Sequence, residues 1–264
     1  MRSIRLAHWL SLDVVCGTLA YQALLHDIFL QQYPTWAELL SMACAVWGIY
    51  LIDRIIDRKK GIVLDQRHAF QAKYAHEIQI GLFVLGIIGS ISVWNLDLRL
   101  IGWGLGLSGI MLVYWVLWYE SRLPALSNSK EFITSLIYAL GVGASTWYRI
   151  PWSWSIVSIG TLLFLLVLQN LGIYTMAESE HAGILGTADT WKRILLGAEM
   201  LFVILFLRII INSHEKMAFL PFATTFALQI WIHYFVKDKL AYRIWGELAY
   251  CSPLLYFAYE FFSK

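Results

Sequence analysis

Long apolar segments separated by short polar ones dominate this sequence. Hydrophobic residues make up 59% of the chain and charged residues only 14%, whereas a soluble domain carries about 25% charged residues. The segments are too long for buried strands, and they reach the roughly 20 residues that a helix needs to cross the hydrocarbon core of a bilayer. The sequence therefore predicts an all-α integral membrane protein.

Hydropathy divides the chain into nine candidate spans within a single transmembrane domain, residues 1–264. Their approximate bounds are 9–29, 37–56, 79–95, 100–118, 132–148, 154–176, 195–212, 218–236 and 244–262. The first segment is expected to be a retained helix rather than a signal peptide. No small-residue cleavage site follows it, and the apolar run after Arg5 contains His8, Asp13 and Gln22.

Basic residues gather in alternate loops. One set of loops holds Arg2, Arg5, Arg58, Lys59, Lys60, Arg67, Lys73, Arg122, Lys130, Lys192, Arg193, Lys237, Lys239 and Arg243. The opposite set holds little beyond Arg99, Arg149 and Lys216. Cytoplasmic loops of membrane proteins collect Lys and Arg. The pattern predicts a cytoplasmic N-terminus and an external C-terminus, which agrees with an odd number of spans.

Charge and cysteine content exclude several other classes of protein. The net charge of +2 is too small to indicate nucleic-acid binding. Cys16, Cys44 and Cys251 lie far apart inside apolar segments and form no Cys-x-x-Cys pair. The sequence therefore indicates neither a zinc site nor a disulfide framework.

Two aspartates mark the end of the second span. Asp53 and Asp57 are four residues apart, so on a helix they share one face. Carboxylates at this spacing suit Mg²⁺, which binds through one or two carboxylates together with water and phosphate oxygens. The alternative is that each aspartate pairs with Arg54 or Arg58 as the helix leaves the membrane.

The sixth span ends in a second polar segment. Asn170, Tyr174 and Glu178 repeat every four residues along one helical face, and Glu180 and His181 follow. By the predicted topology this end also faces the cytoplasm, so the two polar helix ends could border one pocket. The alternative is an exposed loop with ordinary solvated charges.

The layout and the first motif resemble the UbiA-type membrane prenyltransferases. That family has nine transmembrane helices and two Asp-rich motifs on cytoplasmic loops after the second and sixth. Its first motif reads N-D-x-x-D-x-x-x-D. This chain keeps the two later aspartates as Asp53 and Asp57, and it keeps the Arg that follows the first of them as Arg54. Ile49 stands in place of the motif's Asn, and Tyr50 stands in place of its first Asp.

The second family motif is also partly kept. It reads N-x-x-x-D-x-x-x-D followed by Gly, and it falls on Asn170, Tyr174, Glu178 and Gly183. Tyr174 replaces the first Asp and Glu178 the second. The family's Lys before the fifth helix and the Gly about three turns later match Lys130 and Gly141, whereas Leu126 replaces its Tyr.

The resemblance implies transfer of an isoprenyl group from an isoprenyl diphosphate to an aromatic or lipid-soluble acceptor, whose identity stays open. Mg²⁺ would be held by Asp53, Asp57, Glu178 and Glu180. Residues expected at the diphosphate are Lys130, Arg67, Arg54, Asn170 and Tyr174. Metals and cations would stabilise the leaving pyrophosphate, and an apolar cavity would protect the allylic cation from water. We expect a multi-pass protein among membrane lipids, by default in a bacterial plasma membrane.

Two other functions stay open at this point. A terpene cyclase would ionise the same substrate and capture the cation internally, and a catalytically degenerate relative would only bind a polyprenyl lipid. Tyr174 and Ile49 favour the degenerate relative, whereas Asp53, Asp57 and Glu178 argue against it.

The candidate residues also have structural explanations. Lys130 would anchor to lipid headgroups, Arg67 would lie on a loop surface, Asn170 would bond another helix, and Tyr174 would belong to an interfacial aromatic belt. Asp13, a costly charge inside the first span, would either line the cavity or pair with His8.

Overall fold

The computed structural model describes residues 2–59, 66–120, 130–181, 185–212, 216–236 and 239–263. Within these ranges the chain is helical throughout, without a β-strand. The first half contains α1 (Arg2–Trp9), α2 (Leu12–Leu30), α3 (Trp36–Lys59), α4 (Gln66–Lys73), α5 (Ala75–Val93) and α6 (Leu98–Glu120). The second half contains α8 (Lys130–Trp147), α9 (Trp154–His181), α10 (Leu185–Asn212), the 3₁₀ turn η1 (Lys216–Phe219), α11 (Leu220–Phe235), α12 (Lys239–Ala249) and α13 (Ser252–Ser263).

Each apolar segment predicted from the sequence coincides with helix, but two segments are divided. The first is interrupted at Ser11, whose φ of 59° lies in the left-handed region and separates α1 from α2. The last is interrupted between Ala249 and Ser252, where α12 ends and α13 begins. Pro253, in the first turn of α13, lacks the N–H that a continuous helix would need at that position.

Four helical segments are long and apolar enough to cross a membrane. In the part of the chain that the structure describes, they are Trp36–Asp53, Ala75–Val93, Trp154–Ala177 and Gly186–Ile211. They belong to α3, α5, α9 and α10, so they occur in both halves of the chain.

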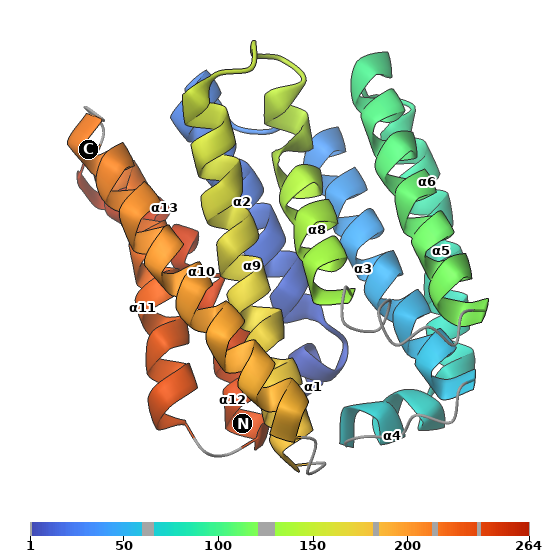
Figure 1. The fold of residues 1–264 in the computed structure, drawn as a ribbon. Helices are drawn as coiled ribbons and strands as arrows, with labels where there is room; N and C mark the ends of the chain where they lie inside the picture. Colours follow the sequence, from blue (N-terminus) through green and yellow to red (C-terminus); the bar gives the residue numbers. More distant parts are fainter. Residues whose placement is uncertain are drawn as a thin grey trace.

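The helices form a bundle in which α2, α3, α8 and α9 occupy the middle (Figure 1). α5 and α6 lie on one side of this group, and α10, α11 and α13 lie on the other. Packing is closest between α9 and α10, between α8 and α9, and between α3 and α5. The N- and C-terminal ends of the chain lie at opposite ends of the bundle (Figure 1).

Apolar side chains cover much of the outer surface, in addition to filling the core. Large apolar side chains face outward, as in Phe83 at 72% exposure and Ile211 at 77%. Polar side chains are buried between the helices, including Thr18, Gln22 and Thr225 at 1% exposure or less. This arrangement suits a lipid environment, in which polar groups must find partners inside the protein.

The apolar core lies where α9 crosses α2 and α8. Leu162, Leu163 and Leu166 of α9 are fully buried and belong to one cluster with Leu24 and Leu25 of α2. Full burial of one such side chain from water stabilises a fold by about 1.5–3 kcal/mol. Between helices in lipid, van der Waals packing provides much of the stabilisation instead. The core therefore fixes α9 at the centre of the bundle and sets the positions of the polar residues at its end.

Candidate functional site

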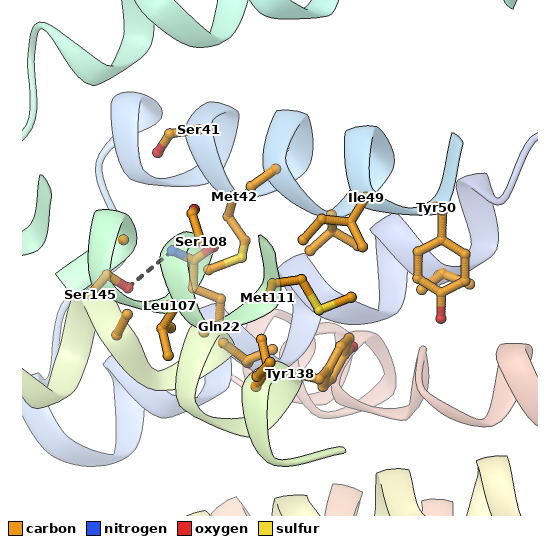
Figure 2. Close-up of a pocket in the computed structure, with 18 of the residues that line it drawn as sticks. Gln22, Ser41, Met42, Ile49, Tyr50, Leu107, Ser108, Met111, Tyr138 and Ser145 are labelled. Atoms are coloured by element: carbon orange, nitrogen blue, oxygen red, sulfur yellow. Dashed lines mark hydrogen bonds between the residues drawn. The ribbon is translucent and has the colours of Figure 1, made fainter. Parts of the chain in front are cut away.

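A cavity of about 340 Å³ lies between α2, α3, α6, α8, α9 and α12 (Figure 2). Most of its lining is apolar, and α12 contributes the polar residue Glu247. Its apolar residues include Val14, Met42, Ala45, Val46, Ile49, Leu100, Ile101, Leu105, Leu107, Met111, Ile137, Val142, Val167 and Leu171. The cavity is long in the direction of α3, since Ser41 and Tyr50 both line it and nine residues of helix span about 13 Å.

The two segments singled out in the sequence meet at this cavity. Ile49 and Tyr50 line it from α3, and Asn170 lines it from α9. Gly141, which the family resemblance also selects, lines it from α8. Positions that are far apart in the sequence thus border one apolar space.

Asp53 lies one turn beyond Tyr50 on α3, and it forms an ion pair with the first residue of α8. The Nζ atom of Lys130 is 3.8 Å from Oδ1 of Asp53, and the two side chains are 37% and 21% exposed. This separation and exposure describe a loose pair that a competing ion or ligand can open. The structure therefore brings together a predicted metal ligand and a predicted diphosphate-binding residue.

Glu131, the neighbour of Lys130, extends this polar end of the bundle to α9. Thr175 Oγ1 donates a hydrogen bond of 2.7 Å to Glu131 Oε1. The other carboxylate oxygen, Oε2, is buried and has no hydrogen-bond partner among the described residues. Glu131 was not predicted as a ligand from the sequence, although it is the neighbour of Lys130.

The other acidic and basic residues predicted for the site belong to described helices, but the structure does not describe their side chains. Asp57 is in α3 one turn after Asp53, and Glu178 and Glu180 are in the last turns of α9. Arg54 and Arg67 are in α3 and α4. In the part that the structure does describe, no group of three or more His, Cys, Asp or Glu side chains is arranged to hold a metal ion.

Tyr174, which replaces an expected aspartate, is fixed against α12. Its hydroxyl donates a 3.1 Å hydrogen bond to the carbonyl oxygen of Arg243, and the Arg243 guanidinium lies 5.6 Å from the ring centroid. Gly246 makes this approach possible, because a Cβ at that position would lie 2.5 Å from the Tyr174 hydroxyl and 2.7 Å from Oδ1 of Asn170. The aromatic ring at this motif position therefore packs two helices together.

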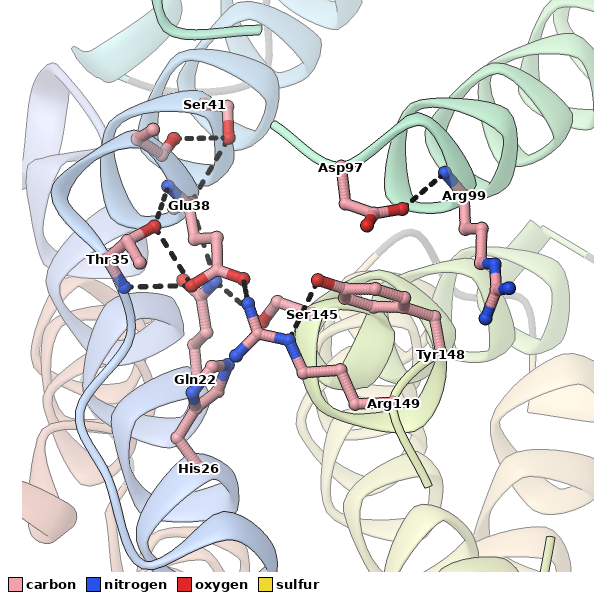
Figure 3. A network of polar contacts seen from close by, with 11 residues as sticks. Gln22, His26, Thr35, Glu38, Ser41, Asp97, Arg99, Ser145, Tyr148 and Arg149 are labelled. Atoms are coloured by element: carbon pink, nitrogen blue, oxygen red, sulfur yellow. Dashed lines mark hydrogen bonds and ion pairs between the residues drawn. The ribbon is translucent and has the colours of Figure 1, made fainter. Parts of the chain in front are cut away.

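The opposite end of the cavity contains a network of polar groups from α2, α3 and α8 (Figure 3). Glu38 caps α3, because its Oε2 accepts hydrogen bonds from the backbone N–H and the hydroxyl of Thr35. Its Oε1 accepts a hydrogen bond from the guanidinium of Arg149, which lies just beyond α8. The T-x-x-E pattern before an apolar run was the available sequence signal for this cap.

Gln22 and His26 of α2 complete the network through Ser145. Gln22 Nε2 donates to Ser145 Oγ at 3.0 Å, and His26 Nε2 shares a 2.9 Å hydrogen bond with the same oxygen. Gln22, Ser145 and Glu38 also line the cavity. None of them was predicted as a site residue from the sequence. Gln22 and Ser145 are single polar residues within apolar segments, which give no motif.

Asp13 pairs with His8, which decides between the two alternatives left open for it. His8 Nδ1 and Asp13 Oδ2 are 2.6 Å apart, and both side chains are buried. The pair joins α1 to α2 across the break at Ser11.

Comparison of the chain with known protein families, with curated proteins and with solved structures finds no match in any of the three.

Proposed function

We propose that this protein is an intramembrane prenyltransferase of UbiA type. It transfers an isoprenyl group from an isoprenyl diphosphate to an aromatic or lipid-soluble acceptor with the help of Mg²⁺. In this proposal the chain crosses the membrane nine times, as a single domain with a cytoplasmic N-terminus. A bacterial plasma membrane is the proposed location.

The observation that carries the proposal is an apolar cavity with carboxylates and a lysine beside one of its ends. Tyr50 and Asn170 line the cavity, and the Asp53–Lys130 pair follows one turn later on α3. A substrate with an apolar chain and an anionic head has the complementary distribution of polarity. The chain would lie in the cavity and the diphosphate at the Asp53–Lys130 end.

Carboxylates near the Asp53 end of the cavity support the proposal of a bound divalent cation. Asp53 is partly exposed at the helix end, Asp57 follows one turn later, and Glu131 has a buried carboxylate oxygen without a partner among the described residues. Carboxylate oxygens are the ligands that Mg²⁺ takes in proteins. When bound, the metal would supply charge neutralisation of the diphosphate.

The protein's own groups would bind and orient the substrate. Lys130 would exchange its loose contact with Asp53 for the diphosphate oxygens, and Arg54 and Arg67 would add positive charge. The apolar walls, among them Met42, Val46 and Met111, would hold the isoprenyl chain and exclude water from the carbon that loses the diphosphate.

Tyr174 favours a second candidate function, a non-catalytic lipid-binding protein. Its hydroxyl donates a hydrogen bond to a backbone carbonyl of α12. The residue at a position where the family has an aspartate therefore packs two helices together and does not supply a carboxylate. A protein with this substitution and no turnover would keep the cavity and use it only to bind an isoprenoid lipid.

A turnover measurement separates these functions. The protein is purified in lipid nanodiscs, supplied with labelled farnesyl diphosphate and Mg²⁺, and followed by pyrophosphate release and product analysis. Asp53→Asn is compared with Asp189→Asn, a matched change at a side chain that is 67% exposed on α10. We expect release by the wild-type protein and by Asp189→Asn, and a loss of about 100-fold or more in Asp53→Asn.

The products identify the reaction. Release with a prenylated acceptor supports the transferase, and a cyclised hydrocarbon formed without any acceptor supports a terpene cyclase. Farnesyl diphosphate binding without release supports the lipid-binding protein. Equal release by wild-type protein and Asp53→Asn contradicts the role given to Asp53.

A further inference from the structure

We propose that the cavity contains a second, neutral recognition site at the end opposite Asp53, built around Gln22. This site takes the hydroxyl group of an apolar, alcohol-type lipid, and the amide oxygen of Gln22 accepts the hydrogen bond. The proposal requires no metal and no diphosphate, so it stands independently of the transfer reaction.

Gln22 is a buried amide that faces the cavity. It is 1% exposed and lines the cavity from α2, together with Ser41, Ser108 and Ser145 from three other helices. Figure 2 shows Gln22 and Ser145 at one end of the cavity and Tyr50 at the other. These polar side chains thus gather at one end of a mostly apolar cavity.

The orientation of the Gln22 amide follows from its neighbours. Nε2 donates to Ser145 Oγ at 3.0 Å and lies 3.4 Å from the carbonyl oxygen of Glu38. A carbonyl oxygen only accepts hydrogen bonds, so the amide nitrogen must be the atom that faces it. Oε1 is left as a buried acceptor without a hydrogen-bond partner among the described residues.

An unpaired buried acceptor is costly, and a ligand that supplies a donor removes this cost. The network around Gln22 holds the amide in place, because Glu38 is itself fixed by Thr35 and Arg149 (Figure 3). Both carboxylate oxygens of Glu38 are occupied by these contacts. The ligand therefore meets a rigid acceptor rather than a mobile side chain.

The charge of the site selects a neutral donor. Oε1 of Gln22 accepts hydrogen bonds, so it cannot bind an ionised phosphate oxygen. The nearby negative charge of Glu38 is balanced by Arg149, which leaves no surplus positive charge for an anion. A hydroxyl group meets both conditions, since it is neutral and can donate a hydrogen bond to Oε1 of Gln22.

The body of the ligand follows from the rest of the lining. Between Gln22 and Tyr50 the cavity wall is formed by side chains such as Met42, Val46, Leu107 and Met111. Unbranched Met side chains adapt to irregular apolar ligands. The cavity thus fits an alcohol with a flexible hydrocarbon chain, with the hydroxyl at Gln22 and the chain directed toward Tyr50.

The test compares an alcohol with its methyl ether, in which a methyl group replaces the hydroxyl hydrogen and removes the donor. Farnesol and farnesyl methyl ether are bound to the protein in nanodiscs without Mg²⁺, and their dissociation constants are measured with tritiated farnesol and by competition. We expect farnesol to bind about tenfold more tightly, the effect of roughly one buried hydrogen bond. Equal affinities for the alcohol and the ether would overturn the proposal.

Variants assign the effect to Gln22. In Gln22→Met the preference for the alcohol falls to about one, while Gln229→Met keeps it. Gln229 is a matched control, since it is another glutamine that is 1% exposed, but it is not part of the cavity lining. An unchanged preference in Gln22→Met would also overturn the proposal, and the two-ligand comparison on wild-type protein decides the matter if Gln22→Met does not fold.

Competition with pyrophosphate distinguishes the two ends of the cavity. Addition of pyrophosphate and Mg²⁺ is expected to leave farnesol binding unchanged, because the hydroxyl lies at the Gln22 end. Displacement of farnesol would instead locate the hydroxyl at the Asp53 end and contradict the proposal. Failure of the transfer reaction leaves this outcome unaffected.

Discussion

The Nζ atom of Lys130 lies 3.8 Å from Oδ1 of Asp53, so the first residue of α8 meets a carboxylate near the end of α3. The two residues lie far apart in the sequence, on α3 and α8, and each was predicted for a different part of the same chemistry. At this distance the pair is loose, and its partial exposure leaves both groups available to a ligand.

Loss of the Lys130 charge is expected to weaken diphosphate binding. Lys130→Met should raise the KM for farnesyl diphosphate by about tenfold, since one charge-assisted contact is removed, while Lys130→Arg should keep most of the affinity. The measurement is steady-state pyrophosphate release over a range of substrate concentrations. Lys192→Met, at a half-exposed side chain on α10, is the control, and an equal KM for Lys130→Met and this control would contradict the role of Lys130.

Gly246→Ala is expected to loosen the contact between α9 and α12. The added Cβ would lie 2.5 Å from the Tyr174 hydroxyl, so the helices or the ring must shift, at a cost of about 1–3 kcal/mol in the free energy of unfolding. Thermal unfolding in detergent measures the loss. Gly197→Ala on α10, where a Cβ meets nothing within 4 Å, should leave the transition unchanged.

A double-mutant comparison attributes this effect to Tyr174. Tyr174→Phe removes the hydroxyl that the Cβ would meet, so the cost of Gly246→Ala should be smaller in the Tyr174→Phe background. An identical cost in both backgrounds would show that the hydroxyl is not the obstacle.

Glu38→Gln is expected to destabilise the end of the bundle that carries Arg149. The substitution leaves the guanidinium without its charged partner, which costs about 2–3 kcal/mol; this is below the range for a fully buried pair because Arg149 is partly exposed. Asp97→Asn changes an exposed acid near the start of α6 and serves as the control. Equal melting temperatures for the two variants would contradict a structural role of the Glu38–Arg149 pair.

Cysteine labelling tests the proposed topology. In a background where Cys16, Cys44 and Cys251 are replaced by Ala, Trp94→Cys should react with a membrane-impermeant thiol reagent in intact cells. Trp94 is 90% exposed beyond the end of α5, on the side predicted to lie outside. Asp189→Cys, also exposed, should react only after the cells are opened, and the reverse pattern would invert the topology.

The helices themselves were largely predictable, because apolar length and hydropathy are properties of contiguous sequence. The register of Asp53 and Asp57 was also predictable, since α3 runs through both residues. The break between α12 and α13 was missed: the segment is apolar throughout, and hydropathy does not register the backbone effect of Pro253.

The candidate site was predictable only where residues are close in sequence. Asp53 and Asp57 on one segment, and Asn170 and Tyr174 on another, carry helical spacing that suggested two polar helix ends, whereas Gln22 lies in an apolar segment without any pattern. The packing role of Tyr174 depends on Gly246 in another helix, and no local signal connects the two.

The sequence alone determined which segments are apolar helices and which of their ends carry acidic and basic residues, because both depend on neighbours along the chain. Only the tertiary structure decided that Lys130 meets Asp53, that Asp13 pairs with His8, and that the amide of Gln22 faces a cavity with an unsatisfied oxygen. The physical reason is that these contacts join different helices. Their formation depends on how the helices pack across one another, which the periodicity of each helix does not specify.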